Sequence, residues 1–131
     1  MPLHCGNSGC VETLTSGHWL TIWHKQNVPD TPFTELFSVH HRNPDLQAFL
    51  QRLAAIISNE MNIIDPQYLF LGGGVLAMDN FPMETLCHLI RRSLRPPLTK
   101  NNLQFVFSRA TDQTGCRGAC LAAQRLFGEG L

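Results

Sequence analysis

The chain has 131 residues, and its ten basic and ten acidic side chains leave no formal net charge. This balance argues against a protein that binds nucleic acid or an anionic membrane through its overall charge. Charged residues make up 15% of the sequence, against roughly 25% in a typical soluble domain. The low fraction predicts that other protein covers part of the surface, although a surface that is merely less charged than usual explains it equally well.

Hydropathy and cysteine content indicate the cellular compartment. No apolar run reaches the roughly 20 residues of a membrane span, and the first residues do not form a signal peptide. The five cysteines are odd in number and scattered, so reduced thiols or metal ligands are expected rather than a disulfide framework. We therefore expect a cytoplasmic protein that does not insert into a membrane.

The first third of the chain predicts short helices after a glycine-rich start. Residues 4–12 read HCGNSGCVE, which is typical of a tight turn carrying thiols. Apolar residues at helical spacing predict a helix over residues 12–25, although Gly17 weakens the pattern. Residues 28–32 contain two prolines and form a linker. A short helix over residues 33–39 follows.

The clearest helix begins at a recognisable cap. Asn43 is a preferred N-cap residue, Pro44 suits the first helical position, and Asp45 suits the first turn. The pattern continues to about Ile63. Its apolar residues recur at steps of three and four positions: Leu46, Phe49, Leu50, Leu53, Ile56, Ile57, Met61 and Ile64.

A buried strand that runs into three glycines is the central feature of the sequence. Residues 68–71 form a short apolar run typical of a strand covered on both faces. Gly72, Gly73 and Gly74 follow, and they allow a sharp turn without side chains above the backbone. Turns at the carboxyl ends of parallel strands bind ligands in open α/β sheets, but three glycines on their own more often form a plain turn.

The remaining elements imply parallel strands joined by helices. A helix over residues 82–95, a strand over residues 103–107 and a closing helix from about residue 114 follow the glycines. Strands that alternate with helices predict a parallel sheet with crossover connections. Two strands make a poor sheet by themselves, so the sheet is expected to be incomplete within this chain.

Three segments together resemble one protein family. Residues 5–12, 65–75 and 115–119 occur in the order and spacing of the carboxyl-terminal part of the ROK family of sugar kinases and sugar-responsive repressors. The resemblance covers residues 5–127. It implies an α/β, actin-like and ribonuclease-H-like ATPase fold whose two lobes hold ATP and sugar between them. The chain would be one carboxyl-terminal lobe, residues 1–131, helix-rich with a short parallel sheet.

The resemblance assigns ligands to particular residues. Residues 65–127 would form the nucleotide-side core, in which Gly72, Gly73 and Gly74 lie beside ATP and leave backbone amides open to phosphate or ribose. Glu12 matches the family's sugar-contacting glutamate, and a carboxylate can accept hydrogen bonds from two neighbouring hydroxyls. Without the family, Glu12 reads as an ordinary acidic residue at a helix start.

The family's zinc knuckle is only partly matched. Residues 1–12 contain two of its cysteines, Cys5 and Cys10, but Leu3 occupies the position of another, and the family's histidine lies further upstream. Structural zinc takes four ligands, so these two thiols would hold zinc only with help from a partner. Cys116 and Cys120 could form a dithiol, but they fit better as small residues that let the last helix pack closely against the sheet.

The expected activity is transfer of the γ-phosphoryl group of ATP, bound with magnesium, to a hexose hydroxyl. Within the family, residues 35–37, 62–66, 81–86 and 94–98 resemble members that act on D-allose, and this resemblance implies a D-allose-like sugar. The 131 residues contain no D-x-G-x-T phosphate motif and no match to the family's catalytic aspartate, so the chain is expected to be a truncated carboxyl-terminal fragment, inactive alone.

Two further readings remain open. The chain could be part of a sugar-sensing repressor, although it has no basic recognition helix to contact nucleic acid. It could also be an interaction module that completes a separate amino-terminal lobe, or it could pair with a second copy of itself.

Overall fold

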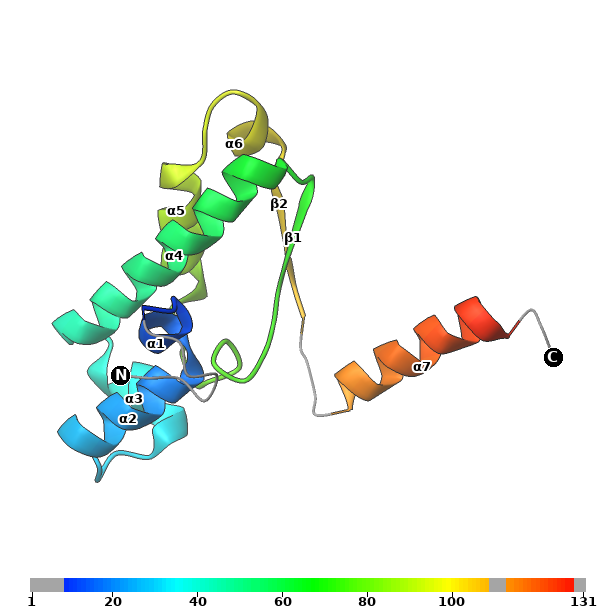
Figure 1. Cartoon of the computed structure of the whole chain (residues 1–131). Helices are drawn as coiled ribbons and strands as arrows, with labels where there is room; N and C mark the ends of the chain where they lie inside the picture. Colours follow the sequence, from blue (N-terminus) through cyan, green and yellow to red (C-terminus); the bar gives the residue numbers. More distant parts are fainter. Residues whose placement is uncertain (1–8, 109–112, 129–131) are drawn as a thin grey trace.

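The computed structural model describes residues 9–108 and 113–128, and its central feature is a long helix packed beside a shorter one (Figure 1). A two-stranded sheet and several short helices surround this pair. In chain order the elements are α1 (Glu12–Thr15), α2 (Gly17–Asn27), η1 (Phe33–Glu35), α3 (Leu36–His40), α4 (Pro44–Ile64), β1 (Tyr68–Leu71), α5 (Met83–Ser93), α6 (Leu98–Asn102), β2 (Gln104–Phe107) and α7 (Thr114–Phe127).

Helix α4 begins where the sequence predicts. The Asn43 side chain accepts a hydrogen bond from the backbone N–H of Asp45 at 2.8 Å, and Pro44 occupies the first turn. The helix ends at Ile64 because Asp65 turns into the left-handed region with φ of 50°. The cap, the first-turn proline and the length of this helix are therefore confirmed.

The two strands pair in parallel, and α5 joins them. The register runs from Tyr68 opposite Gln104 to Leu71 opposite Phe107. Helices α4 and α5 run in the same direction, since the Asn62 side chain near the end of α4 bonds the backbone at the end of α5. The parallel sheet with a crossover helix, the helix-rich α/β class and the shortness of the sheet are confirmed.

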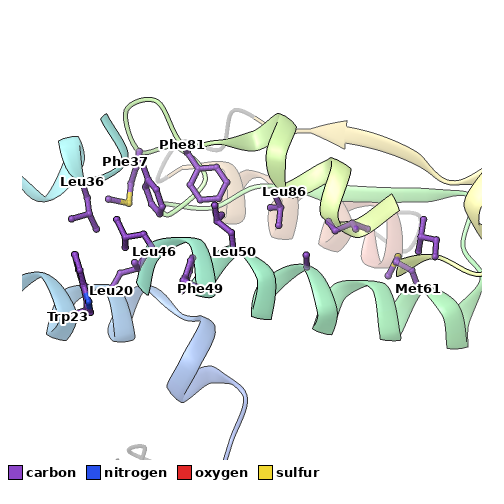
Figure 2. Close-up of a cluster of buried hydrophobic side chains, with 14 of the residues drawn as sticks. Leu20, Trp23, Leu36, Phe37, Leu46, Phe49, Leu50, Met61, Phe81 and Leu86 are labelled. Carbon is purple, nitrogen blue, oxygen red and sulfur yellow. The ribbon is translucent and has the colours of Figure 1, made fainter. Parts of the chain in front are cut away.

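One apolar cluster joins the helices on one side of the sheet. Figure 2 shows side chains from α2, α3, α4, α5 and the loop before α5 pointing toward one another. Burial of such side chains is the main favourable term in folding. The labelled members are Leu20, Trp23, Leu36, Phe37, Leu46, Phe49, Leu50, Met61, Phe81 and Leu86.

The single helix predicted over residues 12–25 is wrong in one respect: it is divided. Ser16 is extended, with φ of −102° and ψ of 165°, and its hydroxyl caps α2 by accepting from the N–H of Trp19 at 3.3 Å. A serine side chain competes with the backbone in this way and favours a helix start over a helix interior. Gly17 is thus the first residue of α2 rather than a weak point inside a helix.

Three smaller differences concern the second half. Helix α5 ends at Ser93 instead of Arg95, and β2 begins at Gln104 rather than at residue 103. Helix α6 was not predicted from the sequence. Two prolines precede it, at positions 96 and 97. Among the described residues, no helix has the length and apolar character needed to cross a membrane.

Helix α7 forms over the predicted residues, but it does not pack against the sheet as expected. Every residue from Thr114 to Phe127 is exposed. In Figure 1 the helix lies apart from the other elements. The prediction relied on its small residues, which permit close packing but do not by themselves impose it.

Candidate functional site

The glycine turn lies at the carboxyl end of β1, next to the end of β2. The backbone N–H of Ser108, just after β2, donates to the carbonyl oxygen of Leu71 at 2.8 Å. The turn then closes through hydrogen bonds from Ala77 N–H to the Gly73 carbonyl and from Met78 N–H to the Val75 carbonyl. The three glycines are exposed at this corner.

The structure explains the absence of a side chain at two of the three glycines. Gly73 has φ of +108°, which strains any other residue. A Cβ on Gly72 would lie 3.2 Å from the Cβ of Ser108, so the close approach of the two strand ends favours glycine here. A Cβ on Gly74 would meet nothing within 4 Å. Close approach of Ser108 therefore accounts for Gly72 and backbone conformation for Gly73, whereas Gly74 has no structural reason.

Helix α1, which carries Glu12, is packed beside this turn. A Cβ on Gly17, just after α1, would lie 3.2 Å from Cγ2 of Val75, just after the turn. Glu12 is exposed, and it lies one helical turn before Thr15 on the same side of α1. The sequence did not predict that Gly17 lies close to Val75, although a glycine in a helical pattern often has a packing reason.

A small cavity separates α1 from the glycine turn. Its volume is about 250 Å³, and it opens beside Gly72. Apart from the hydroxyl of Thr15 and the backbone, apolar side chains form its wall. The lining residues are Thr15, Leu53, Ile57, Phe70, Leu71, Gly72, Val75, Leu76 and Leu86.

Replacing Gly74 with alanine should separate a binding role from a structural one. Because space is open there, Gly74→Ala should change the melting temperature by no more than roughly 2 °C. If a ligand approaches the backbone closely at this turn, the same methyl group should weaken its binding by about tenfold. Calorimetric titration with ATP and thermal melting measure the two effects. Equal ATP affinity in both proteins would remove Gly74 from the site.

The predicted metal residues do not form a metal site within the described chain. Cys5 lies outside the described residues. Cys10 is half-buried with a free thiol, and its carbonyl accepts hydrogen bonds from the N–H and hydroxyl of Thr13. Over residues 9–108 and 113–128 no three histidine, cysteine or acidic side chains are grouped to hold a metal ion.

The other described cysteines differ in exposure. Cys116 and Cys120 are exposed on α7. Cys87 is half-buried on α5, and burial raises the pKa of its thiol, an effect that the nearby Arg91 guanidinium opposes. A raised pKa lowers the thiolate fraction at a given pH, and the thiolate is the reactive form.

Alkylation should follow this difference. At about pH 8, iodoacetamide should modify Cys116 and Cys120 at least several-fold faster than Cys87. The rate at Cys87 should keep rising as the pH increases above its ordinary pKa. Mass spectrometry of the digested protein measures all three rates. Modification of Cys87 first would contradict the assigned burial.

Two polar residues before β1 have clear structural roles. The Asn62 amide donates to the Ser93 carbonyl at 3.0 Å, and its oxygen accepts from the N–H of Arg95 at 2.8 Å. The Asp65 carboxylate accepts from the buried hydroxyl of Thr99 at 2.7 Å. These bonds fix the ends of α4, α5 and α6 beside β1, so Asn62 and Asp65 position the strand and its glycine turn.

Comparison with known proteins gives consistent family likeness. A model described as the ROK family matches residues 2–125. The N-acetyl-D-glucosamine kinase of Escherichia coli O157:H7 is 30% identical over 125 residues, which cover 88% of this chain and 39% of that kinase. The kinase of the same name from Yersinia enterocolitica, serotype O:8 / biotype 1B, is 26% identical over 125 residues, with the same coverage.

A solved structure shares the fold. The crystal structure of a ROK family transcriptional regulator, a homolog of the E. coli MLC protein, superposes with a TM-score of 0.66 at 23% identity. The match covers 96% of this chain and 36% of the regulator. The chain thus spans about 39% of the length of the curated kinases that it matches.

Proposed function

Because this chain belongs to the ROK family and has its actin-like, ribonuclease-H-like fold, we propose that it forms the nucleotide-side lobe of an ATP-dependent hexose kinase. Residues Gly72, Gly73 and Gly74 would lie along ATP, and Glu12 would bind the sugar. The complete reaction would also use groups that residues 1–131 do not provide.

The observation that supports this proposal most directly is the contact between the two segments. Thr15 and Gly72 line the same cavity, and a Cβ added to Gly17 would lie only 3.2 Å from Cγ2 of Val75. A phosphoryl donor and its acceptor must be held next to each other in the reactive geometry. The shared cavity between segments about 60 residues apart in the sequence supports this proposal.

The residues present would bind and orient rather than perform the proton transfer. The exposed glycine backbone can approach phosphate oxygens closely, since Gly74 leaves space above the chain. The Glu12 carboxylate would accept hydrogen bonds from two neighbouring sugar hydroxyls. The γ-phosphoryl group would pass from ATP to one sugar oxygen, with ADP as the leaving group, and a carboxylate outside the matched segments would accept the hydroxyl proton.

The identity of the sugar is the finer part of the proposal. Residues 35–37, 62–66, 81–86 and 94–98 favour D-allose, whereas the named relatives are N-acetyl-D-glucosamine kinases. In this structure Asn62 and Asp65 bond the ends of helices, so the 62–66 stretch supports the fold more directly than it supports a sugar preference. A hexose is proposed, with D-allose as the first candidate.

A chimeric kinase tests the proposed function. Residues 1–131 replace the matching part of the E. coli O157:H7 N-acetyl-D-glucosamine kinase, and ADP release is followed with D-allose, N-acetyl-D-glucosamine and D-glucose. Sugar-dependent ADP release is expected from the chimera and none from residues 1–131 alone. Turnover by the isolated chain, or a folded chimera that binds ATP but releases no ADP with any of these sugars, would overturn the proposal.

The alternative is the sugar-sensing part of a ROK repressor, and the solved regulator is the observation that favours it. Both classes would use Glu12 to bind sugar, so sugar binding cannot separate them. Turnover of ATP by the chimera would favour the kinase. If the separately expressed amino-terminal part of that kinase restores turnover and co-purifies with the chain, the chain also acts as a completing module.

A further inference from the structure

A polar cavity lies at the amino ends of β1 and β2, at the opposite end of the sheet from the glycine turn. Its volume is about 370 Å³, near the lower end of the roughly 300–1,000 Å³ of sites that hold small molecules. A strand of four residues is roughly 13 Å long, so this cavity is separate from the residues proposed to lie along ATP. The lining residues are Asp65, Pro66, Gln67, Asn101, Asn102 and Gln104.

Hydrogen bonds fix the three segments that surround the cavity. The Asp65 carboxylate accepts from the Thr99 hydroxyl at 2.7 Å, which joins the segment before β1 to α6. The backbone N–H of Gln104 donates to the carbonyl oxygen of Gln67 at 2.9 Å, which joins the starts of the two strands. The backbone of the cavity is therefore set before a ligand arrives, and this lowers the entropic cost of binding.

Four side-chain amides around the cavity are not used by the fold. Gln67, Asn101, Asn102 and Gln104 are exposed, and over residues 9–108 and 113–128 their side chains make no hydrogen bond to the protein. The Asn62 amide, in contrast, makes two hydrogen bonds with the backbone at the end of α5. Each free amide offers two N–H donors and one acceptor oxygen, so the cavity presents both kinds of group to a ligand.

The charges of the lining argue against an anionic ligand and against a divalent cation. The lining contains one carboxylate and no lysine or arginine, so a phosphate or carboxylate group would meet repulsion without a compensating charge. Calcium and magnesium bind through oxygen ligands alone, and tight sites use several carboxylates. One carboxylate among four amides, each with an NH₂ group, is a poor match to that requirement.

A molecule with many hydroxyl groups fits this lining best. A hydroxyl group donates one hydrogen bond and accepts others, and the four amides and the Asp65 carboxylate supply partners for both roles. One oxygen of Asp65 bonds Thr99, which leaves the other for a ligand. An apolar ligand would cover these polar groups without replacing their hydrogen bonds to water, which is unfavourable.

We propose that this cavity is a second binding site, specific for an uncharged sugar or polyol. The amides and Asp65 bind the hydroxyl groups, and the ring of Pro66 lies against the carbon atoms of the ligand. Because the site is open to solvent, the dissociation constant is expected in the millimolar range. The site is distinct from Glu12, which lies on α1 beside the glycine turn, and it does not depend on the proposed kinase activity.

Nuclear magnetic resonance of the side-chain amides tests this site. Residues 1–131 are labelled with ¹⁵N at asparagine and glutamine and titrated with D-glucose to about 50 mM. The NH₂ signals of Gln67, Asn101, Asn102 and Gln104 should shift and approach saturation. The NH₂ signal of Asn27, which bonds the Trp23 carbonyl in α2, should stay in place.

Two variants at the cavity and two controls define the site. Asn102→Ala and Gln104→Ala should each raise the dissociation constant for D-glucose by about three- to tenfold. Asn59→Ala removes an exposed amide from α4, outside the cavity, and should have no effect. Glu12→Gln should also have none, which separates this site from the proposed sugar contact of the kinase reaction. All four side chains are exposed, so the melting temperatures should remain equal.

Three results would overturn this inference. In the first, D-glucose causes no saturable shift of the four amides. In the second, Asn59→Ala or Glu12→Gln weakens binding as much as Asn102→Ala does. In the third, calcium chloride shifts the same amides and D-glucose does not, which would identify the cavity as a cation site.

Discussion

Replacing Phe49 with alanine is expected to lower the free energy of unfolding by about 3–5 kcal/mol. Phe49 is fully buried in α4, and its ring stacks on Trp19 of α2 with centroids 5.5 Å apart and an interplanar angle of 15°. Trp19 in turn stacks on Trp23 at 6.3 Å. Loss of the Phe49 ring would therefore leave a cavity and remove the support that orders α2 on α4.

This loss is large relative to the total free energy of unfolding of a small domain. Small domains are stable by about 5–15 kcal/mol, so Phe49→Ala should leave much of the sample unfolded near body temperature. Urea denaturation followed by circular dichroism measures the loss. Ile63→Ala is the control: Ile63 lies on the same helix but is 83% exposed, and its replacement should cost no more than about 0.5 kcal/mol. A loss below about 1 kcal/mol for Phe49→Ala would contradict the assigned core.

Replacing Glu12 with glutamine in the chimeric kinase should lower kcat/KM for the sugar by about 10- to 100-fold. A hydrogen bond to a charged group contributes about 1.5–3 kcal/mol, and the neutral amide accepts with only one oxygen. Because Glu12 is exposed at the start of α1, the change should hardly alter the melting temperature. The KM for ATP should remain the same.

Glu60→Gln provides the matched control, because Glu60 is an exposed acid near the other end of the molecule on α4. It should leave kcat/KM for the sugar unchanged. Equal losses in the two variants would point to an effect of net charge. An unchanged kcat/KM in Glu12→Gln would instead support the interpretation of Glu12 as an ordinary acidic residue at a helix start.

Local chemistry made the main elements predictable. Asn43 and Pro44 specify the start of α4 through the cap and the missing N–H. The period of apolar residues identified α4 and α5, and the run from Tyr68 to Leu71 identified a strand. The prediction that this strand is covered on both faces is wrong for the described chain, because Tyr68 and Phe70 are exposed. These signals lie within one turn or one strand, so the sequence alone contains them.

Features that depend on contacts between distant segments could not be predicted in the same way. Helices α1 and α2 are divided at Ser16 because the serine hydroxyl caps α2. A serine can also lie inside a continuous helix, so the local sequence does not decide between the two arrangements. The contact of Gly17 with Val75 joins segments far apart in the sequence. The two hydrogen bonds that the Asn62 side chain makes with the backbone at the end of α5 likewise join residues far apart in the sequence.

The candidate site was predictable in part. The glycine turn follows β1 as predicted, and Gly73 has the positive φ that favours glycine. The ligands of Gly72, Gly73, Gly74 and Glu12 remain predictions. Cys10 has no ligand partners in the described chain. The open side of the sheet could not be recognised in the sequence, because Tyr68 and Phe70 read as residues of a strand covered on both faces.

The central claim is that the glycine turn borders ATP, and selective labelling tests it directly. The chain has ten glycines, so ¹⁵N-glycine labelling of residues 1–131 gives a simple amide spectrum for titration with Mg–ATP. The amides of Gly72, Gly73 and Gly74 should shift with increasing ATP, while Gly128 after α7 should not. Shifts confined to other glycines, or no shift at millimolar ATP, would contradict the account.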